Sequence, residues 1–173
     1  MSATEGIAQV NTLATHTAIS AWAFASAFLA IIVLVAALFL FAWYVGKGPF
    51  VALIFSLYSG YALFATFPYL SLLPTAPALT AFFSQVAVFA VFTFISYLVL
   101  RRVVVSDFLY IGPIGLIMLC FLATGFLLAL VYQVFPLHDA YAFTPAVDAL
   151  FAPKQWFFAW FVAPLIGLFF LAR

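Results

Sequence analysis

Charged side chains are almost absent from this chain, since only 5% of its 173 residues are Asp, Glu, Lys or Arg. A soluble domain carries about a quarter charged residues, whereas 70% of the residues here are hydrophobic. Such a chain cannot keep its apolar surface away from water, so the lipid bilayer must be its solvent. The formal net charge of +1 argues against nucleic acid as a partner, because binding phosphates needs a basic face.

Cysteine and an N-terminal basic segment are equally scarce. Cys120 is the only cysteine, so no intramolecular disulfide can form and cysteine usage does not reveal the redox compartment. Residues 1–20 contain no Lys or Arg and therefore lack the basic region of a cleaved signal peptide. We expect residues 1–20 to be a short tail and residues 21–173 to be a single transmembrane helical domain.

The stretch from residue 48 to residue 100, between Lys47 and Arg101, contains no Asp, Glu, Lys, Arg or His. Its two apolar runs are joined by a proline-punctuated turn, which predicts a transmembrane hairpin with both charged ends on one side of the membrane. Adding the other apolar runs predicts an all-α, polytopic membrane bundle of about five spans. The first of them would reach about 36 Å, enough to cross ~30 Å of hydrocarbon. The predicted spans cover residues 21–44, 49–70, 80–100, 111–135 and 156–172.

The last apolar run leaves the span count open. It is at the lower length limit for a span, and Pro164 inside it suggests a kink. Four spans with a re-entrant or interfacial C-terminal helix are therefore the alternative to five.

The basic residues predict the orientation in the membrane. If the N-terminus is outside, four of the five basic residues fall on the inner face, as the positive-inside rule requires. The Arg101-Arg102 pair also suits contact with anionic lipid headgroups, although its role as a topology signal needs no further explanation. The compact loops indicate a bacterial or archaeal plasma membrane. The inner-face residues are Lys47, Arg101, Arg102 and Arg173, and the outer face receives Lys154, Glu5, Asp139 and Asp148.

Small residues form a stripe on the second predicted span. Ala52, Ser56 and Gly60 follow one another at spacings of four, with Ser59 beside them. Such a stripe lets another helix approach closely, which is how helices associate in lipid. It predicts a helix-packing interface with another integral membrane protein or with a second copy of the chain.

No ionisable residue lies near the centre of any predicted span. Proton-coupled transporters, ion pumps and voltage sensors usually carry charged or His side chains there, and haem-carrying bundles need axial ligands at membrane depth. Both histidines, His16 and His138, fall in predicted extramembrane segments. We therefore expect no cofactor, no metal and no catalytic residues.

The loop over residues 136–153 holds a possible polar cluster on the outer face, formed by His138, Asp139 and Asp148. A zinc site needs three or four preorganised ligands, so solvated loop residues are the favoured interpretation. Thr144-Pro145 is typical of an N-cap followed by a proline at the first helical position. It predicts a short interfacial helix over residues 144–152, with Asp148 on the exposed side.

The first hairpin resembles the colicin V production (CvpA-like) group of small bacterial inner-membrane proteins. The resemblance rests on an apolar N-terminal span, the basic turn Gly46-Lys47-Gly48-Pro49-Phe50 and the following span VALIFSLYSGYALF. It covers roughly residues 21–135, and the chain departs from the group by its N-terminal tail, its proline-rich turn and its extra C-terminal run. It implies an inner-membrane protein linked to secretion or envelope maintenance, with no catalytic residues to carry over.

Three functions fit this pattern. The leading hypothesis is a non-catalytic membrane subunit or scaffold that packs against other membrane proteins. The alternative is a small transporter or channel component whose pathway forms on oligomerisation. The third is a membrane enzyme or accessory that uses His138 and Asp139. The channel hypothesis requires a wet cavity lined by Ser56, Tyr58, Ser59, Tyr61 and Gln85.

Overall fold

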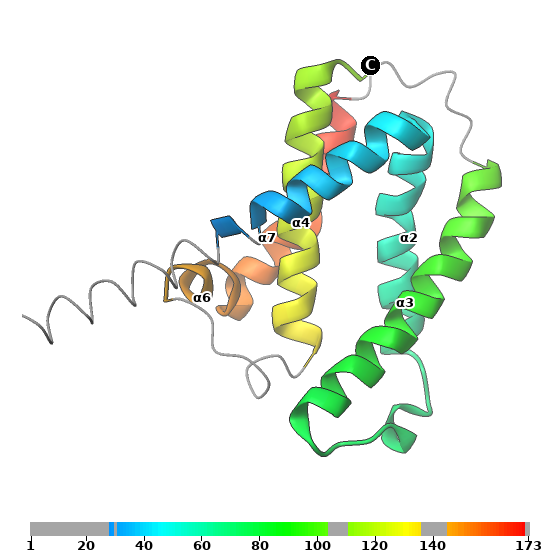
Figure 1. Ribbon diagram of the computed structural model, residues 1–173, viewed down its shortest axis with the longest axis vertical. Helices are drawn as coiled ribbons and strands as arrows, with labels where there is room; N and C mark the ends of the chain where they lie inside the picture. The colour runs from blue at the N-terminus through cyan, green and yellow to red at the C-terminus, as the bar shows by residue number, and fades with distance from the viewer. Residues whose placement is uncertain (1–27, 30, 104–110, 136–144, 172–173) are drawn as a thin grey trace, which may run out of the picture.

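The computed structural model describes residues 28–29, 31–103, 111–135 and 145–171. All regular structure in these residues is helical (Figure 1). A helix over Ile31–Val45 precedes α2 (Lys47–Ala65), the 3-10 helix η1 (Leu70–Leu72), α3 (Ala78–Val103), α4 (Pro113–Val134), α6 (Pro145–Phe151) and α7 (Lys154–Leu171).

Four of the helices, α2, α3, α4 and α7, are long and apolar enough to cross a membrane. The predicted all-α fold with several helices able to span a membrane is therefore confirmed for the described residues. α7 is an 18-residue helix that contains Pro164, so its length meets the minimum for a span. The helix Ile31–Val45 is shorter, and residues 21–27 and 30 of the predicted first span lie outside the described residues, so the fifth span stays a prediction.

The ends of the spanning helices are set by Gly, Pro and Thr. Gly46 precedes α2 with a φ of 112°, a left-handed conformation that glycine adopts without steric cost. α2 ends at Ala65, five residues before the predicted end, because Pro68 disfavours helical geometry at the residue before it. There the Thr66 hydroxyl donates a hydrogen bond back to the Ala62 carbonyl at 2.9 Å.

α4 begins at Pro113 directly after Gly112. At the first position of a helix the missing N–H of a proline leaves no helical hydrogen bond unmade.

The spanning helices associate as two close antiparallel pairs, α2 with α3 and α4 with α7. In the first pair Gly60 lies against Thr93, and Phe64 meets Phe89 with ring centroids 6.2 Å apart. In the second pair, later residues of α4 contact earlier residues of α7, which shows that the two helices are antiparallel. These contacts are Gly115 with Leu171, Leu122 with Gly167, and Gly125 with Trp160.

Large side chains fill the space between the two pairs. Tyr58 of α2 stacks on Phe126 of α4 with centroids 4.4 Å apart, and Phe161 of α7 stands edge-on to both rings. Phe50 and Ile54 are fully buried in the same seam. The helix Ile31–Val45 runs obliquely across α4 to the start of α2 (Figure 1), so the core is closed on that side as well.

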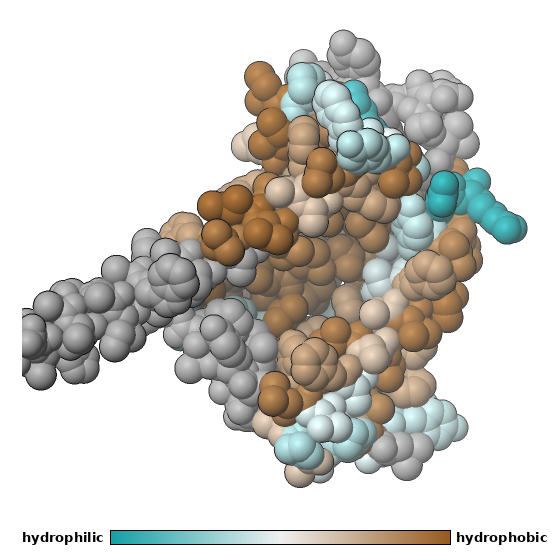
Figure 2. Space-filling model, viewed as in Figure 1, coloured by the Kyte–Doolittle hydropathy of each residue, from teal (hydrophilic) through white to brown (hydrophobic). Residues whose placement is uncertain are grey.

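The described charges lie at the two ends of the bundle. Lys47 begins α2 and donates its Nζ proton to the carbonyl of Ile111, just before α4. Because α3 is antiparallel to α2, Arg101 and Arg102 in its last turn reach that same end. Figure 2 shows strongly hydrophilic colour at the C-terminal end of α3. Lys154 begins α7 at the opposite end. Arg173 lies outside the described residues.

Candidate functional site

The predicted packing stripe on α2 faces the inside of the chain. Ala52 and Ser56 are fully buried, and the Ser56 hydroxyl donates to the Leu53 carbonyl at 2.6 Å. Gly60 lies so close to α3 that an added Cβ would stand 3.0 Å from the Thr93 Cα. Ser59 is only half-buried and donates to the Phe55 carbonyl at 3.0 Å. The close helix partner of Gly60 is therefore α3 of the same chain, whereas the spacing alone predicts another membrane protein or a second copy as the partner.

Two tyrosines expected to line a polar pathway, Tyr58 and Tyr61, instead contact α7 of the same chain. The Tyr58 hydroxyl donates to the Phe161 carbonyl, next to the Trp160 carbonyl, which lacks its helical donor because Pro164 has no N–H. Neighbouring helices commonly satisfy the backbone around a proline in a membrane helix. Tyr61 contacts the rings of Phe157 and Phe161. The space beside these tyrosines is thus occupied by aromatic rings.

Thr93 carries a polar atom without a hydrogen-bond partner in the described part of the chain. Its side chain is 8% exposed and its Oγ1 atom is unpaired. The hydroxyl faces Gly60, which provides no side-chain acceptor. A threonine hydroxyl in a helix can bond a carbonyl of its own preceding turn, a hydrogen bond that Thr93 does not make.

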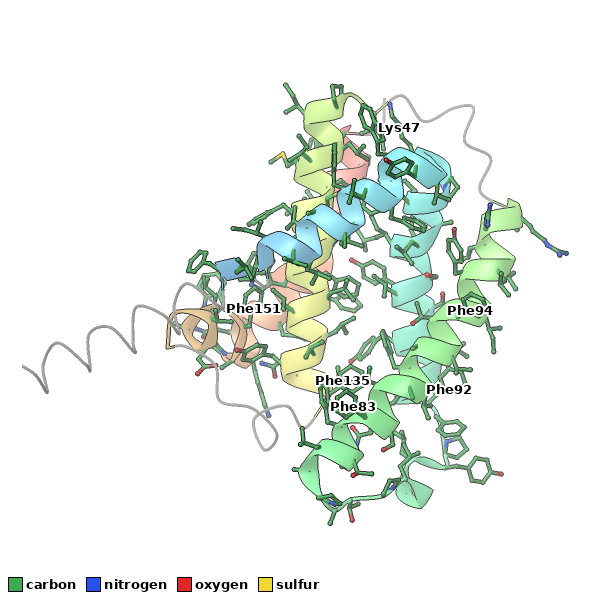
Figure 3. All side chains as sticks on the ribbon, in the orientation of Figure 1. Lys47, Phe83, Phe92, Phe94, Phe135 and Phe151 are labelled. Carbon is green, nitrogen blue, oxygen red and sulfur yellow. The ribbon has the colours of Figure 1, made fainter. Side chains whose placement is uncertain are left out.

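A long apolar groove opens between α3 and α4. It has a volume of about 390 Å³, or about 880 Å³ with its open mouth included. Its floor is formed by Leu53 and Leu57 of α2, and one wall by positions 82–97 of α3. The other wall is formed by positions 127–131 of α4 and by Phe135, which directly follows α4. Figure 2 shows a hydrophobic hollow on this face, and Figure 3 places Phe135 where α4 and α3 converge.

The short helix α6 is held by hydrogen bonds from α4 and α7. Gln133 donates from Nε2 to the carbonyls of Phe151 and Ala152 at 3.1 and 2.7 Å. Trp160 donates to the Leu150 carbonyl at 3.3 Å. These three carbonyls belong to the C-terminal end of α6, where helix carbonyls have no partner in their own helix.

Asp148 takes part in the same attachment. It accepts a 3.0 Å hydrogen bond from the Tyr132 hydroxyl and is half-buried, so its predicted position on the exposed side of the short helix is wrong. The other two members of the predicted cluster, His138 and Asp139, lie outside the described residues. No group of three metal-ligating side chains occurs among the residues that the structure describes.

A second small-residue stripe, not among the predicted site residues, lies on α7. Ala159, Ala163 and Gly167 have the same spacing of four that marked α2. Gly167 is buried, with Leu122 against it, whereas Ala159 is exposed and Ala163 half-buried. Apolar hollows of about 240 Å³ and about 660 Å³ lie on its two sides, and Ala159 and Ala163 line both of them.

Comparisons of the chain with known protein families, with curated protein sequences and with solved structures find no match.

Proposed function

We propose that the chain is a non-catalytic integral membrane subunit or scaffold, and that α7 is the helix with which it packs against another membrane protein. The observation that carries this proposal is that exposed Ala159 and half-buried Ala163 line two apolar hollows on α7. Small residues allow two helix backbones to approach closely in lipid. Large side chains of a partner helix would then fill the hollows on either side.

The distribution of charge supports the same function. In the described residues Lys47, Arg101, Arg102 and Lys154 lie in the terminal turns of their helices, and Asp148 lies in α6. The described interior of the spans therefore offers no ionisable group of the kind that ion and proton pathways use. The resemblance of the first hairpin to CvpA-like proteins adds a bacterial inner membrane as the expected location.

The alternative, a transporter or channel component, requires a pathway between chains. Ser56, Ser59 and Tyr58 donate to helix carbonyls within the single chain. A wet cavity would have to form where copies meet, and this function stays a prediction.

The proposal is tested by a tagged pull-down from native membranes in mild detergent, with mass and stoichiometry measured for the eluted complex. Ala159→Leu and Ala163→Leu should each reduce the co-purified partner roughly tenfold, which corresponds to about 1.4 kcal/mol, because the added side chain holds the helices apart. Ala87→Leu makes the same change at an exposed position of α3 and should leave the partner bound.

Co-purification that is unchanged in both α7 variants would show that this face is not the interface. Elution of a defined homo-oligomer with no other protein attached would favour the channel alternative. Flux assays in liposomes would then follow.

A further inference from the structure

The groove between α3 and α4 has the dimensions of a site for an acyl chain. Along α3 it extends from Phe82 to Tyr97, a length of about 22 Å at 1.5 Å per residue. A transmembrane helix of that length and about 10 Å diameter occupies roughly 1,700 Å³, about twice the 880 Å³ that the groove and its mouth provide. The groove therefore cannot enclose a whole helix, whereas it can hold a hydrocarbon chain, which is only one methylene wide.

One end of the groove leads to a cation. Arg101 follows Tyr97 by four residues and Phe94 by seven, and residues at these spacings share one face of a helix. Arg101 therefore continues the α3 wall of the groove. Arg102 is rotated by a further 100° and points away from it. Both arginines are exposed in the last turn of α3.

Asp148 is too far from Arg101 to form an ion pair with it. Asp148 is the acidic residue in the described part of the chain, and it belongs to α6 at the other end of the bundle, where it contacts Tyr132. Arg101 would lie at the cytoplasmic surface in the N-out orientation, and anionic lipids are enriched in that leaflet.

We propose that an anionic phospholipid binds here, with one acyl chain in the groove and its phosphate at Arg101. Arg binds phosphate through charge-assisted hydrogen bonds. Tyr97, one helical turn before Arg101, also lines the groove. The apolar side chains of the groove exclude a polar ligand, and the arginine selects an anionic headgroup over a zwitterionic one. This site is separate from the α7 surface and does not depend on it.

The test is native mass spectrometry of the full chain in detergent micelles, titrated with phosphatidylglycerol and, in parallel, with phosphatidylcholine. The wild-type chain should retain one phosphatidylglycerol molecule in preference to phosphatidylcholine. Arg101→Gln should lower this retention about fivefold, and Arg102→Gln should change it by less than about twofold. The two variants remove the same charge and differ only in the face they occupy.

A second pair of variants tests the groove itself. Ala90 is exposed and lines the groove, so Ala90→Trp should block acyl-chain entry and abolish retention, while Ala87→Trp on the neighbouring exposed surface should not. Circular dichroism would verify that each variant is folded. Equal losses for Arg101→Gln and Arg102→Gln, wild-type retention in Ala90→Trp, equal retention of the two lipids, or a partner protein in place of lipid would each overturn the proposal.

Discussion

Gly60 is the residue at which α2 and α3 come closest. A Cβ at this position would stand 3.0 Å from the Thr93 Cα and would also collide with the Thr93 side chain. The Cα is a backbone atom, so it can move away only if the two helices separate. Without a hydrophobic force between helices in lipid, this close packing is a main source of their association.

We predict that Gly60→Ala lowers the free energy of unfolding by roughly 1–3 kcal/mol, the usual cost of overpacking a tight interior. The measurement is unfolding in mixed micelles followed by circular dichroism. Gly112→Ala is the matched control, because a Cβ there meets nothing within 4 Å and φ is −66°. Its effect should stay within about 0.5 kcal/mol.

Gly167→Ala gives an intermediate case in the other helix pair. The nearest atom to its added Cβ is the Leu122 Cδ1 at 2.6 Å, which is the end of a side chain that can rotate away. Its cost should fall between those of the other two variants. If Gly60→Ala proved as harmless as Gly112→Ala, the close α2–α3 approach would be excluded.

Among the elements, α6 depends most on side chains outside itself. It is only seven residues long, and a helix of this length is not stable in isolation. Gln133 and Trp160 supply donors to its C-terminal carbonyls, while Val147 and Phe151 bury their side chains against Tyr132 and Ala129. α6 is therefore attached to the bundle by both polar and apolar contacts.

Replacing Gln133 by Leu should loosen α6 without unfolding the spans. The volume is nearly kept, but two carbonyls lose their donor, which costs about 1–3 kcal/mol for buried groups. Hydrogen exchange of a peptide covering residues 147–152 should become roughly tenfold faster or more. Gln155→Leu, at an exposed position of α7, should leave that exchange rate unchanged, and equal rates in the two variants would show that the Gln133 contacts do not hold α6.

For the whole molecule, the antiparallel pairs determine which charges share a membrane face. Lys47, Arg101 and Arg102 lie at one end, and Lys154 lies at the other. The positive-inside rule then predicts that the end with three cations faces the cytoplasm.

Cysteine labelling in intact cells tests this orientation. In a Cys120→Ala background, Arg102→Cys should react only with a membrane-permeant reagent, whereas Lys154→Cys should also react with an impermeant one added outside. Helices α4 and α6 lie between the two positions in the chain, and the predicted orientation places the bilayer between them in space. Reaction of both positions from the same side would contradict the bundle as well as its orientation.

The sequence by itself determined the solvent, the helical class and the approximate spans, because a bilayer leaves an apolar chain few ways to satisfy its backbone. It also located the small residues on α2, because residues four apart share one face of any helix. Spacing cannot say which neighbour covers a stripe, since that depends on how the helices are arranged. Only the tertiary structure decided that Gly60 packs on Thr93 of the same chain, while Ala159 stays exposed on α7. The roles of Gln133 and Arg101 depend on the same arrangement, because their partners and neighbours come from distant parts of the chain.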